Sequence, residues 1–365
     1  MRVLVVNAGS SSLKLRTLDG GDELVASQDL PLARGEIDAH AVRKALSDTL
    51  APEAVGHRIV HGGERFTEPV RLDTEVETAL RELTDLAPLH QPKSLAALDA
   101  VSSALPEVPA VACFDTAFHG TLPQAAATYA LPAAWRERFG LRRFGFHGLS
   151  HAYASRRTQE LLGRADLRLV SCHLGAGASL AGVRDGRSVD TTMGFTPLEG
   201  LVMATRSGSV DPGLLLWLLE HEAMTEREMA AALEHESGLA GLAGTSEMRD
   251  VLAGAEAGMP EAELALDVYV HRLRTSIGAM AAALGGLDAL VFTGGVGERS
   301  PAIRALACRG LGFLGVELDP GRNGEATSDA RVSRADSPVA ILAIESREDL
   351  QIAAEVRRVL SSERA

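Results

Sequence analysis

The sequence predicts an α/β fold built from two related domains, and three observations support this prediction. The chain has 365 residues, about twice the length of a typical domain. Short apolar runs alternate with helical stretches, as expected for strands that helices cover on both faces. A strand–turn–strand pattern occurs twice, around Gly9 and around Gly175, which indicates a duplicated unit.

Six apolar runs end at glycine or at polar turn residues, and we predict each of them to be a strand. They cover residues 2–6, 54–60, 108–114, 167–173, 287–292 and 339–344. Their apolar residues are continuous rather than alternating, which is typical of strands buried on both faces.

Capping signals mark the starts of the predicted helices. A proline fits the first helical turn, a Thr-x-x-Glu pattern forms a capping box, and a serine fits the N-cap. These starts are Pro92, the pair Thr225 and Glu228, Pro260, Ser300 with Pro301, and Ser346. The helix that begins at Pro260 is expected to end at Gly285.

The internal repeat has a fixed spacing. Gly9 is followed eleven residues later by Gly20, and Gly175 is followed eleven residues later by Gly186. Both later glycines stand in an Asp-Gly pair, a frequent signal for a tight turn between strands. Each copy therefore predicts a strand, a small-residue turn, a second strand and a second turn.

Composition excludes several classes of function. With 36 basic and 49 acidic residues the net charge is −13, which argues against a nucleic-acid partner. The three cysteines are widely spaced and form no CxxC, so neither a zinc site nor a disulfide framework is expected. Reduced thiols and the lack of a long apolar run favour a cytoplasmic protein without a membrane span.

Glycine-rich segments follow three of the predicted strands, and their sequences are NAGSSSLK, HLGAGAS and TGGVGERS. Backbone N–H groups in such turns can approach an anion closely, and Lys14 adds a cation. An ordinary hairpin turn explains a single one of these loops equally well. No Gly-Lys pair exists for a Walker loop, and no complete GxGxxG is present for a dinucleotide site.

Polar residues at strand ends are candidates for the chemistry. Arg58 stands in an apolar run, so it needs either an anionic ligand or an internal carboxylate. Asp115 follows a strand, where it could face a ligand or cap a helix. Glu348 is explained equally by the dipole of a helix N-terminus, and His147 by packing or by stabilisation of an anion.

The segment MGFTPLEGLVMATRSGSVDPG is rich in Gly, Pro and Thr, and we predict it to be a long ordered loop. It contains Arg206. Long loops in compact domains often carry functional residues, so Arg206 is a further candidate.

Eight motifs, in this order along the chain, resemble those of acetate kinases: NAGSSSLK, GHRIVHGGERF, LAPLHQP, FDTAFH, GFHGLSH, CHLGAGAS, TTMGFTPLEGLVMATRSGSVDP and FTGGVGERS. The resemblance spans residues 1 to about 350. It implies a duplicated actin-like ATPase fold, similar to sugar kinases, heat-shock chaperones and actin, with two domains flanking a cleft. The expected domains are 1–119 with 349–365, and 120–348.

The resemblance also implies roles for individual residues on the carboxylate side. Catalytic roles fall to Asn7, Arg58, His90, Asp115, His147 and Arg206. Magnesium would be held by Asn7, Asp115 and Glu348. Substrate binding would fall to Arg58, Val60, Leu89, Phe146 and Pro197, of which the last four would form the apolar pocket for the methyl group.

On the phosphate and nucleotide side the resemblance implies Ser10, Ser12, Lys14, His173, Gly175, Ala176, Gly177, Glu247, Met248, Arg249, Gly295, Val296 and Gly297. Three departures from the family pattern lie on this side. Ala176 replaces an asparagine, Glu247-Met248 replaces Asp-Phe, and Arg299 and Arg347 replace frequent asparagines. The preference for the phosphoryl donor therefore stays open.

The implied reaction is reversible, direct phosphoryl transfer between ATP and acetate with Mg²⁺, or Mn²⁺ as its substitute, in a cytoplasmic homodimer. Propionate as acceptor and pyrophosphate or GTP as donor are alternatives. A nucleotide-binding regulator without turnover would not need Arg58 or the apolar pocket. A glycosidase built on Asp115 and Glu199 would have no use for the glycine hairpins.

Overall fold

The computed structural model describes residues 1–9, 12–32, 37–47, 50–86, 91–222, 224–327 and 329–362. The contacts between residues divide the chain into two compact units. Unit 1 consists of Met1–Gly120, Phe146–Tyr153 and Arg347–Ala365, and unit 2 consists of Thr121–Gly145 and Ala154–Ser346.

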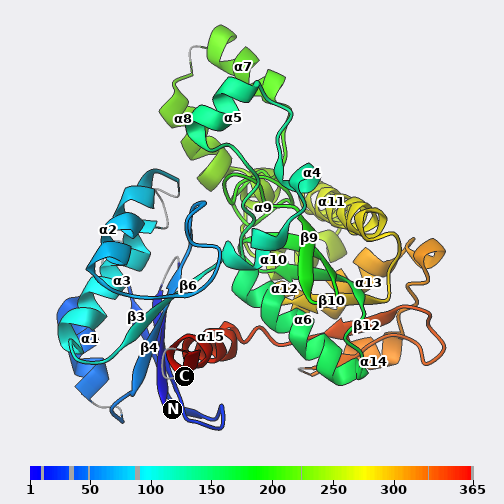
Figure 1. Cartoon of the computed structure of the whole chain (residues 1–365). Helices are drawn as coiled ribbons and strands as arrows, with labels where there is room; N and C mark the ends of the chain where they lie inside the picture. Colours follow the sequence, from blue (N-terminus) through cyan, green and yellow to red (C-terminus); the bar gives the residue numbers. More distant parts are fainter. Residues whose placement is uncertain are drawn as a thin grey trace. The chain divides into compact units, whose positions relative to one another are not determined.

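Unit 1 is built on a six-stranded mixed sheet with the order β3-β2-β1-β4-β6-β5 (Figure 1). Its strands are β1 (Val3–Ala8), β2 (Ser12–Leu18), β3 (Leu24–Pro31), β4 (Ala54–Ile59), β5 (Val70–Arg71) and β6 (Ala110–Phe114). The central strands β1, β4 and β6 are parallel, whereas β2, β3 and β5 run antiparallel to their neighbours.

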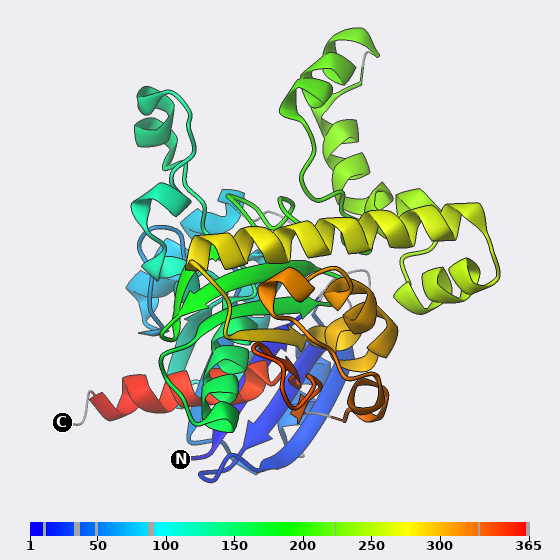
Figure 2. The same cartoon turned by 90° about the vertical axis from the view of Figure 1, so that its right-hand side faces the viewer.

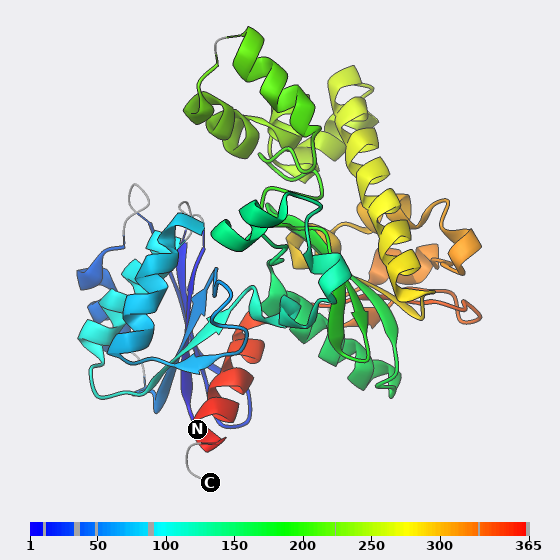
Figure 3. The ribbon, with the colours of Figure 1, turned by 45° about the horizontal axis from the view of Figure 1, so that its top comes forward.

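Helices cover both faces of this sheet. They are α1 (Ala39–Ser47), α2 (Thr74–Glu82), α3 (Gln91–Ala104) and α15 (Glu348–Ser362). Successive residues of β1 alternate between the two faces. Val3 and Val5 pack with Ile352 of α15, while Leu4 and Val6 belong to the cluster that α1 and α3 complete. Figure 3 shows the blue sheet between α15 in red and the helices on its other side.

Unit 2 contains a second six-stranded mixed sheet, with the order β11-β12-β10-β7-β8-β9. Its strands are β7 (Arg168–Leu174), β8 (Ala178–Arg184), β9 (Arg187–Thr191), β10 (Ala289–Thr293), β11 (Ala330–Arg331) and β12 (Ala340–Ala343). The long helix α11 (Pro260–Leu284) packs on β7, β8 and β9, as Figure 2 shows in yellow.

The other helices of the second half of the fold are shorter, and α6 begins within unit 1. They are α4 (Gln124–Ala127), α5 (Ala133–Phe139), α6 (Gly148–Leu162), α7 (Pro212–His221), α8 (Glu226–Ala231), α9 (Gly238–Ala243), α10 (Met248–Glu256), α12 (Gly294–Arg299), α13 (Pro301–Cys308) and α14 (Pro320–Glu325). Among the described residues, no helix is both long enough and apolar enough to cross a membrane.

The two sheets repeat one topology. Read from the other edge, the second order is β9-β8-β7-β10-β12-β11, and each strand then matches its counterpart in unit 1, including the parallel or antiparallel sense of every pairing. A glycine opens the first turn of each unit, and the turn of unit 2 is one residue shorter, since the Gly9 N–H donates to Ser12 O and the Gly175 N–H to Gly177 O, both at 2.9 Å. The predicted α/β duplication is confirmed.

Most predicted helix signals are confirmed as well. Thr225 and Glu228 form a reciprocal capping box, and the Ser300 side chain caps α13. Helix α11 begins at Pro260, and Gly285 ends it with a left-handed backbone (φ 70°). The long loop around Arg206 is confirmed over residues 193–211, which contain neither helix nor strand, whereas Pro212 and Gly213 begin α7.

Three features differ from the sequence predictions. Helix α15 begins at Glu348, so Arg347 rather than Ser346 holds its N-cap position. The segment TGGVGERS is not a loop, because its residues Gly294–Arg299 form α12. Gly294 has φ 76°, and a Cβ there would lie 2.8 Å from Leu174 O, so this glycine permits close packing of α12 on β7. The strand β3 was not predicted, because its residues alternate between half-exposed and exposed and therefore lack an apolar run.

Candidate active site

Four polar side chains of unit 1 meet at one end of the sheet. Asn7 lies near the end of β1, Arg58 near the end of β4, and Asp115 directly after β6. Because these three strands are adjacent and parallel, their carboxyl ends share one edge, the usual place for ligands in an open α/β sheet. Glu348, the first residue of α15, joins them.

Arg58 is the centre of this cluster. Its Nη2 donates to Asp115 Oδ2 at 2.5 Å, and its Nε lies 3.1 Å from Oδ1 and 3.2 Å from Oδ2. Its Nη1 donates to Asn7 Oδ1 at 3.0 Å. The Asn7 Nδ2 in turn donates to Glu348 Oε2 at 2.9 Å, and that oxygen lies 3.9 Å from Arg58 Nε. Of the two partners left open from the sequence, the structure gives Arg58 an internal carboxylate.

Burial and neighbouring charges shift the pKa values of this cluster. The side chains of Arg58 and Glu348 are each 16% exposed, and that of Asp115 is 2% exposed. Burial raises the pKa of Asp115, the Arg58 charge opposes this, and Glu348 adds to the rise. Burial works against protonation of Arg58, but the two carboxylates outweigh it and raise the pKa of the guanidinium. Perturbed titratable groups at a sheet edge are typical of functional sites.

Backbone contacts place His147 next to this cluster. The Gly148 N–H donates to Asp115 O at 2.8 Å, and a Cβ on Gly148 would lie 2.2 Å from that oxygen. His147 itself has a left-handed backbone, with φ 56°, which is uncommon for a residue other than glycine. Strain of this kind concentrates at functional positions.

Buried histidines support the same segment. The Phe146 carbonyl lies 3.1 Å from His119 Nε2, and the His61 ring packs edge-on against the Phe146 ring at 5.5 Å. His119 also contacts the ring of His151 at 5.8 Å. Sequence analysis did not select His61, His119 or His151, because the contacts that place them join distant parts of the chain.

The remaining predicted residues of unit 1 are buried, lie on the β1–β2 hairpin, or fall outside the described residues. Val60, which directly follows β4, and Phe146 are both buried. Lys14 is exposed on β2 and pairs in register with Asn7, so the two side chains share one face of the hairpin. Ser12 begins β2. Ser10, Leu89 and His90 lie outside the described residues.

In unit 2 the structure brings together a second set of predicted residues. Arg206 Nε pairs with Glu234 Oε2 at 3.0 Å, and Nη1 points to the Pro197 carbonyl at 3.4 Å. The Ala176 carbonyl accepts the Ala204 N–H at 3.0 Å, which ties the glycine turn to the loop that carries Arg206. Glu234, which sequence analysis did not select, is therefore part of this set.

The residues predicted for the nucleotide side all lie in unit 2. His173, Gly175, Ala176 and Gly177 belong to the end of β7 and the turn into β8. Gly295, Val296 and Gly297 belong to α12, which packs on β7. Glu247 is the N-cap residue of α10, and Met248 and Arg249 begin that helix, which contacts α9.

Comparisons with known proteins identify relatives of this chain. The family model of the Acetokinase family matches residues 26–354. An acetate kinase of Synechococcus sp. is 45% identical over 405 residues, which cover 100% of both chains. Among solved structures, the acetate kinase of Porphyromonas gingivalis is 35% identical at a TM-score of 0.90, covering 98% of this chain and 99% of that one.

A propionate kinase from Francisella tularensis is 32% identical at a TM-score of 0.89, again covering 98% of this chain and 99% of that one. The repeated sheet topology and these neighbours confirm the duplicated actin-like ATPase fold. Because the family model spans most of the sequence and relatives match along its whole length, the chain belongs to the acetokinase family.

Proposed function

We propose that this protein catalyses reversible, direct in-line transfer of the γ-phosphoryl group of ATP to acetate, giving acetyl phosphate and ADP. Family membership makes it a phosphotransferase whose acceptor is a carboxyl group. The single observation that carries the proposal is the cluster of Asn7, Arg58, Asp115 and Glu348 at the carboxyl ends of β1, β4 and β6.

The reaction depends mainly on positioning of the substrates and on stabilisation of the charge that develops during transfer. Acetate is ionised at neutral pH, so no general base is needed. The loose phosphoryl transition state spreads negative charge over its equatorial oxygens, and cationic donors held in place lower its free energy. We assign this role to Arg58, Arg206 and His147, with His90 on the phosphate side. The carboxylates that hold Arg58 and Arg206 fix the two guanidinium groups before substrate arrives.

The residues of the cluster fit Mg²⁺, because they supply two carboxylates and one amide oxygen, the hard ligands that this ion prefers. Asp115, Glu348 and Asn7 would hold the ion, partly through its waters. When bound, it would neutralise phosphate charge. Mn²⁺ accepts the same ligands.

ATP is the proposed donor. The turns at Gly9 and Gly175 offer backbone N–H groups, and Ser10, Ser12 and Lys14 add donors on the phosphate side. His173, Gly175, Ala176, Gly177, Glu247, Met248, Arg249, Gly295, Val296 and Gly297 are assigned to the nucleotide. Pyrophosphate or GTP is the alternative donor, since the departures at Ala176 and Met248 lie here.

Val60, Leu89, Phe146 and Pro197 are proposed to receive the methyl group of acetate. One additional methylene in an apolar pocket changes binding by only about 1–3 kcal/mol. Propionate is therefore the alternative acceptor, and the similarity to a propionate kinase favours testing it.

We also propose that the protein acts as a cytoplasmic homodimer. Helix α7 is almost wholly apolar in sequence, yet none of its residues is buried within the chain. Leu214, Leu216 and Trp217 are 48%, 60% and 48% exposed. Contiguous exposed apolar side chains usually mark an interface, and a second copy of this chain would cover them.

A panel of donors and acceptors tests the reaction. We expect the highest kcat/KM for ATP with acetate, a lower value for propionate, and a negligible value for butyrate. A clear preference for pyrophosphate would refute ATP as the donor, and a preference for propionate would refute acetate as the acceptor.

A further inference from the structure

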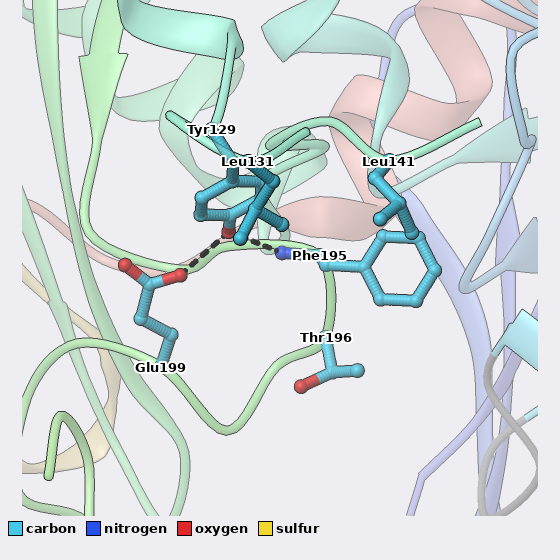
Figure 4. A pocket seen from close by; sticks show the side chains of 6 residues that line it. All are labelled: Tyr129, Leu131, Leu141, Phe195, Thr196 and Glu199. Atoms are coloured by element: carbon cyan, nitrogen blue, oxygen red, sulfur yellow. Dashed lines mark hydrogen bonds between the residues drawn. The ribbon is translucent and has the colours of Figure 1, made fainter. Parts of the chain in front are cut away.

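A hydrogen-bonded network in unit 2 stands outside the residues assigned above. Tyr129 Oη donates to Glu199 Oε2 at 2.6 Å and accepts the Phe195 N–H at 2.8 Å (Figure 4). Arg143 Nη2 donates to the other carboxylate oxygen, Glu199 Oε1, at 2.7 Å. The guanidinium also lies 5.5 Å from the centre of the Tyr129 ring. Three side chains from three segments thus hold one another.

This network contacts the backbone of residues 191–195. Arg143 Nη1 lies within 2.9–3.3 Å of three successive carbonyls, those of Thr191, Thr192 and Met193. A Cβ on Gly194 would lie 1.8 Å from Glu199 Oε2 and 2.2 Å from Tyr129 Oη, so the network packs directly on this glycine. Five backbone positions in a row are therefore contacted by Arg143, Tyr129 or Glu199.

An open pocket of about 300 Å³ adjoins the same segment, lined by Tyr129, Leu131, Leu141, Phe195, Thr196 and Glu199. Phe195 and Thr196 are half-buried beside it, and the Phe195 ring lies 5.8 Å from that of Phe144. Packing therefore restrains this segment on one side, and the hydrogen bonds of the network add restraints to the backbone itself.

Two predicted active-site segments depend on the position of this backbone. Pro197 follows Phe195 by two residues, and its carbonyl faces Arg206 Nη1. The Gly194 carbonyl accepts the N–H groups of Phe144 at 3.0 Å and Gly145 at 3.2 Å, and the chain continues directly into residues 146 and 147.

We propose that Tyr129, Arg143 and Glu199 are positioning residues that set the place of Pro197 and Arg206, and through them the acceptor size that the enzyme accepts. The inference rests on the proposed function for its kinetic consequence. Burial raises the pKa of Tyr129 to about 12, and Glu199 adds to the rise, so the phenol stays protonated and remains a donor to Glu199.

The test combines hydrogen exchange with acceptor kinetics in Tyr129→Phe. We expect the amide of Phe195, which loses its acceptor, to exchange at least tenfold faster. We expect the KM for acetate to rise about fivefold, the KM for ATP to stay within twofold, and the kcat/KM ratio of propionate to acetate to rise at least threefold.

Tyr269→Phe is the matched control, because the buried Tyr269 hydroxyl has no hydrogen-bond partner within the described part of the chain. Glu199→Gln should reproduce the effects of Tyr129→Phe, with the exposed Glu107→Gln as its control. Arg143→Lys keeps the charge but not the planar guanidinium. Its amide exchange rates and acceptor ratio should therefore lie between those of the wild type and those of Arg143→Met.

Unchanged amide exchange at residues 193–196 overturns this inference and leaves the proposed function intact. An unchanged kcat/KM ratio of propionate to acetate in an active Tyr129→Phe does the same. A wild-type protein that transfers phosphoryl to no carboxylate refutes the proposed function, and the role in acceptor choice falls with it. If activity fell only in proportion to the folded fraction of the variant, the network would be purely structural and the inference would be wrong.

Discussion

The guanidinium of Arg58 lies 2.5 Å from the carboxylate of Asp115, and the same guanidinium holds the side-chain oxygen of Asn7 at 3.0 Å. The pair is buried, so its geometry is fixed before any substrate binds. Removing one partner leaves the other charge in an environment of low polarity, which is far more costly than losing an exposed ion pair. Both activity and stability should therefore depend on this contact.

Arg58→Ala should lower kcat at least a hundredfold, because losing one donor to the transition-state charge costs about 3–4 kcal/mol. It should also lower the free energy of unfolding by about 3–5 kcal/mol, since Asp115 stays buried without its cation. Steady-state kinetics and thermal melts measure the two effects.

Arg58→Lys serves as the better-folded second variant, and Arg65→Ala, in an exposed pair with Glu75, is the control. The control should change stability by less than about 1 kcal/mol. A folded Arg58→Lys with wild-type kcat would contradict the role given to the guanidinium.

Arg206→Ala should reduce kcat far more than it raises the KM for acetate. This arginine is assigned to charge that develops during transfer, and a loss restricted to the transition state appears in kcat. Kinetics with acetate as the varied substrate give the split, and the exposed Arg272→Ala is the control. If only KM changed, Arg206 would bind substrate without taking part in the chemistry.

Gly148→Ala should impair both folding and activity, because its Cβ would lie 2.2 Å from Asp115 O and 2.9 Å from Phe118 Cβ. Overpacking of this kind costs about 1–3 kcal/mol. Gly278→Ala, within α11 and without a neighbour inside 4 Å, should instead stabilise the protein by about 0.5–1 kcal/mol. Denaturant titrations measure both variants, and equal destabilisation by the two would argue against the close approach at Gly148.

Stability should fall as the pH drops from about 6.5 to about 4. Burial lowers the pKa of His57 from 6.5 to about 4 in the folded protein, so the unfolded chain takes up a proton in this range that the folded chain does not. The effect of this one histidine is about 3 kcal/mol at most. His57→Leu should flatten the pH dependence of the free energy of unfolding, whereas the exposed His40→Gln should keep it. An equally steep dependence in His57→Leu would place its cause elsewhere.

Replacing both Leu216 and Trp217 by glutamate should convert a dimer to a monomer, because two charges would then stand on the apolar face of α7. Light scattering during gel filtration measures the mass. Phe313→Glu, at a residue that is 79% exposed away from α7, should leave the mass unchanged. A wild-type monomer at micromolar concentration would refute the homodimer.

The sequence predicted those features that local patterns encode. The repeated Gly and Asp-Gly spacing corresponds to one antiparallel hairpin in each unit, and the strand ends at Asn7, Arg58 and Asp115 do meet. Adjacent parallel strands bring such residues together through the sheet topology alone, so their proximity follows once the strands are recognised.

Other features depend on contacts between distant segments. Tyr129 and Glu199 are 70 residues apart in irregular parts of the chain, so no periodic pattern predicts their hydrogen bond. The pairing of Arg206 with Glu234 depends in the same way on how a long loop packs. Sequence analysis missed helix α12 because its three glycines disfavour a helix. Packing against β7 overrides that preference in the structure.

Trapping of acetyl phosphate by hydroxylamine tests the central proposal most directly, since the hydroxamate forms only if phosphoryl has reached the carboxylate. With ATP, Mg²⁺ and acetate, the wild-type protein should form hydroxamate in step with ADP, and Arg58→Lys should form far less of both. ADP released without hydroxamate, or no product from a folded protein, would contradict transfer of phosphoryl to acetate.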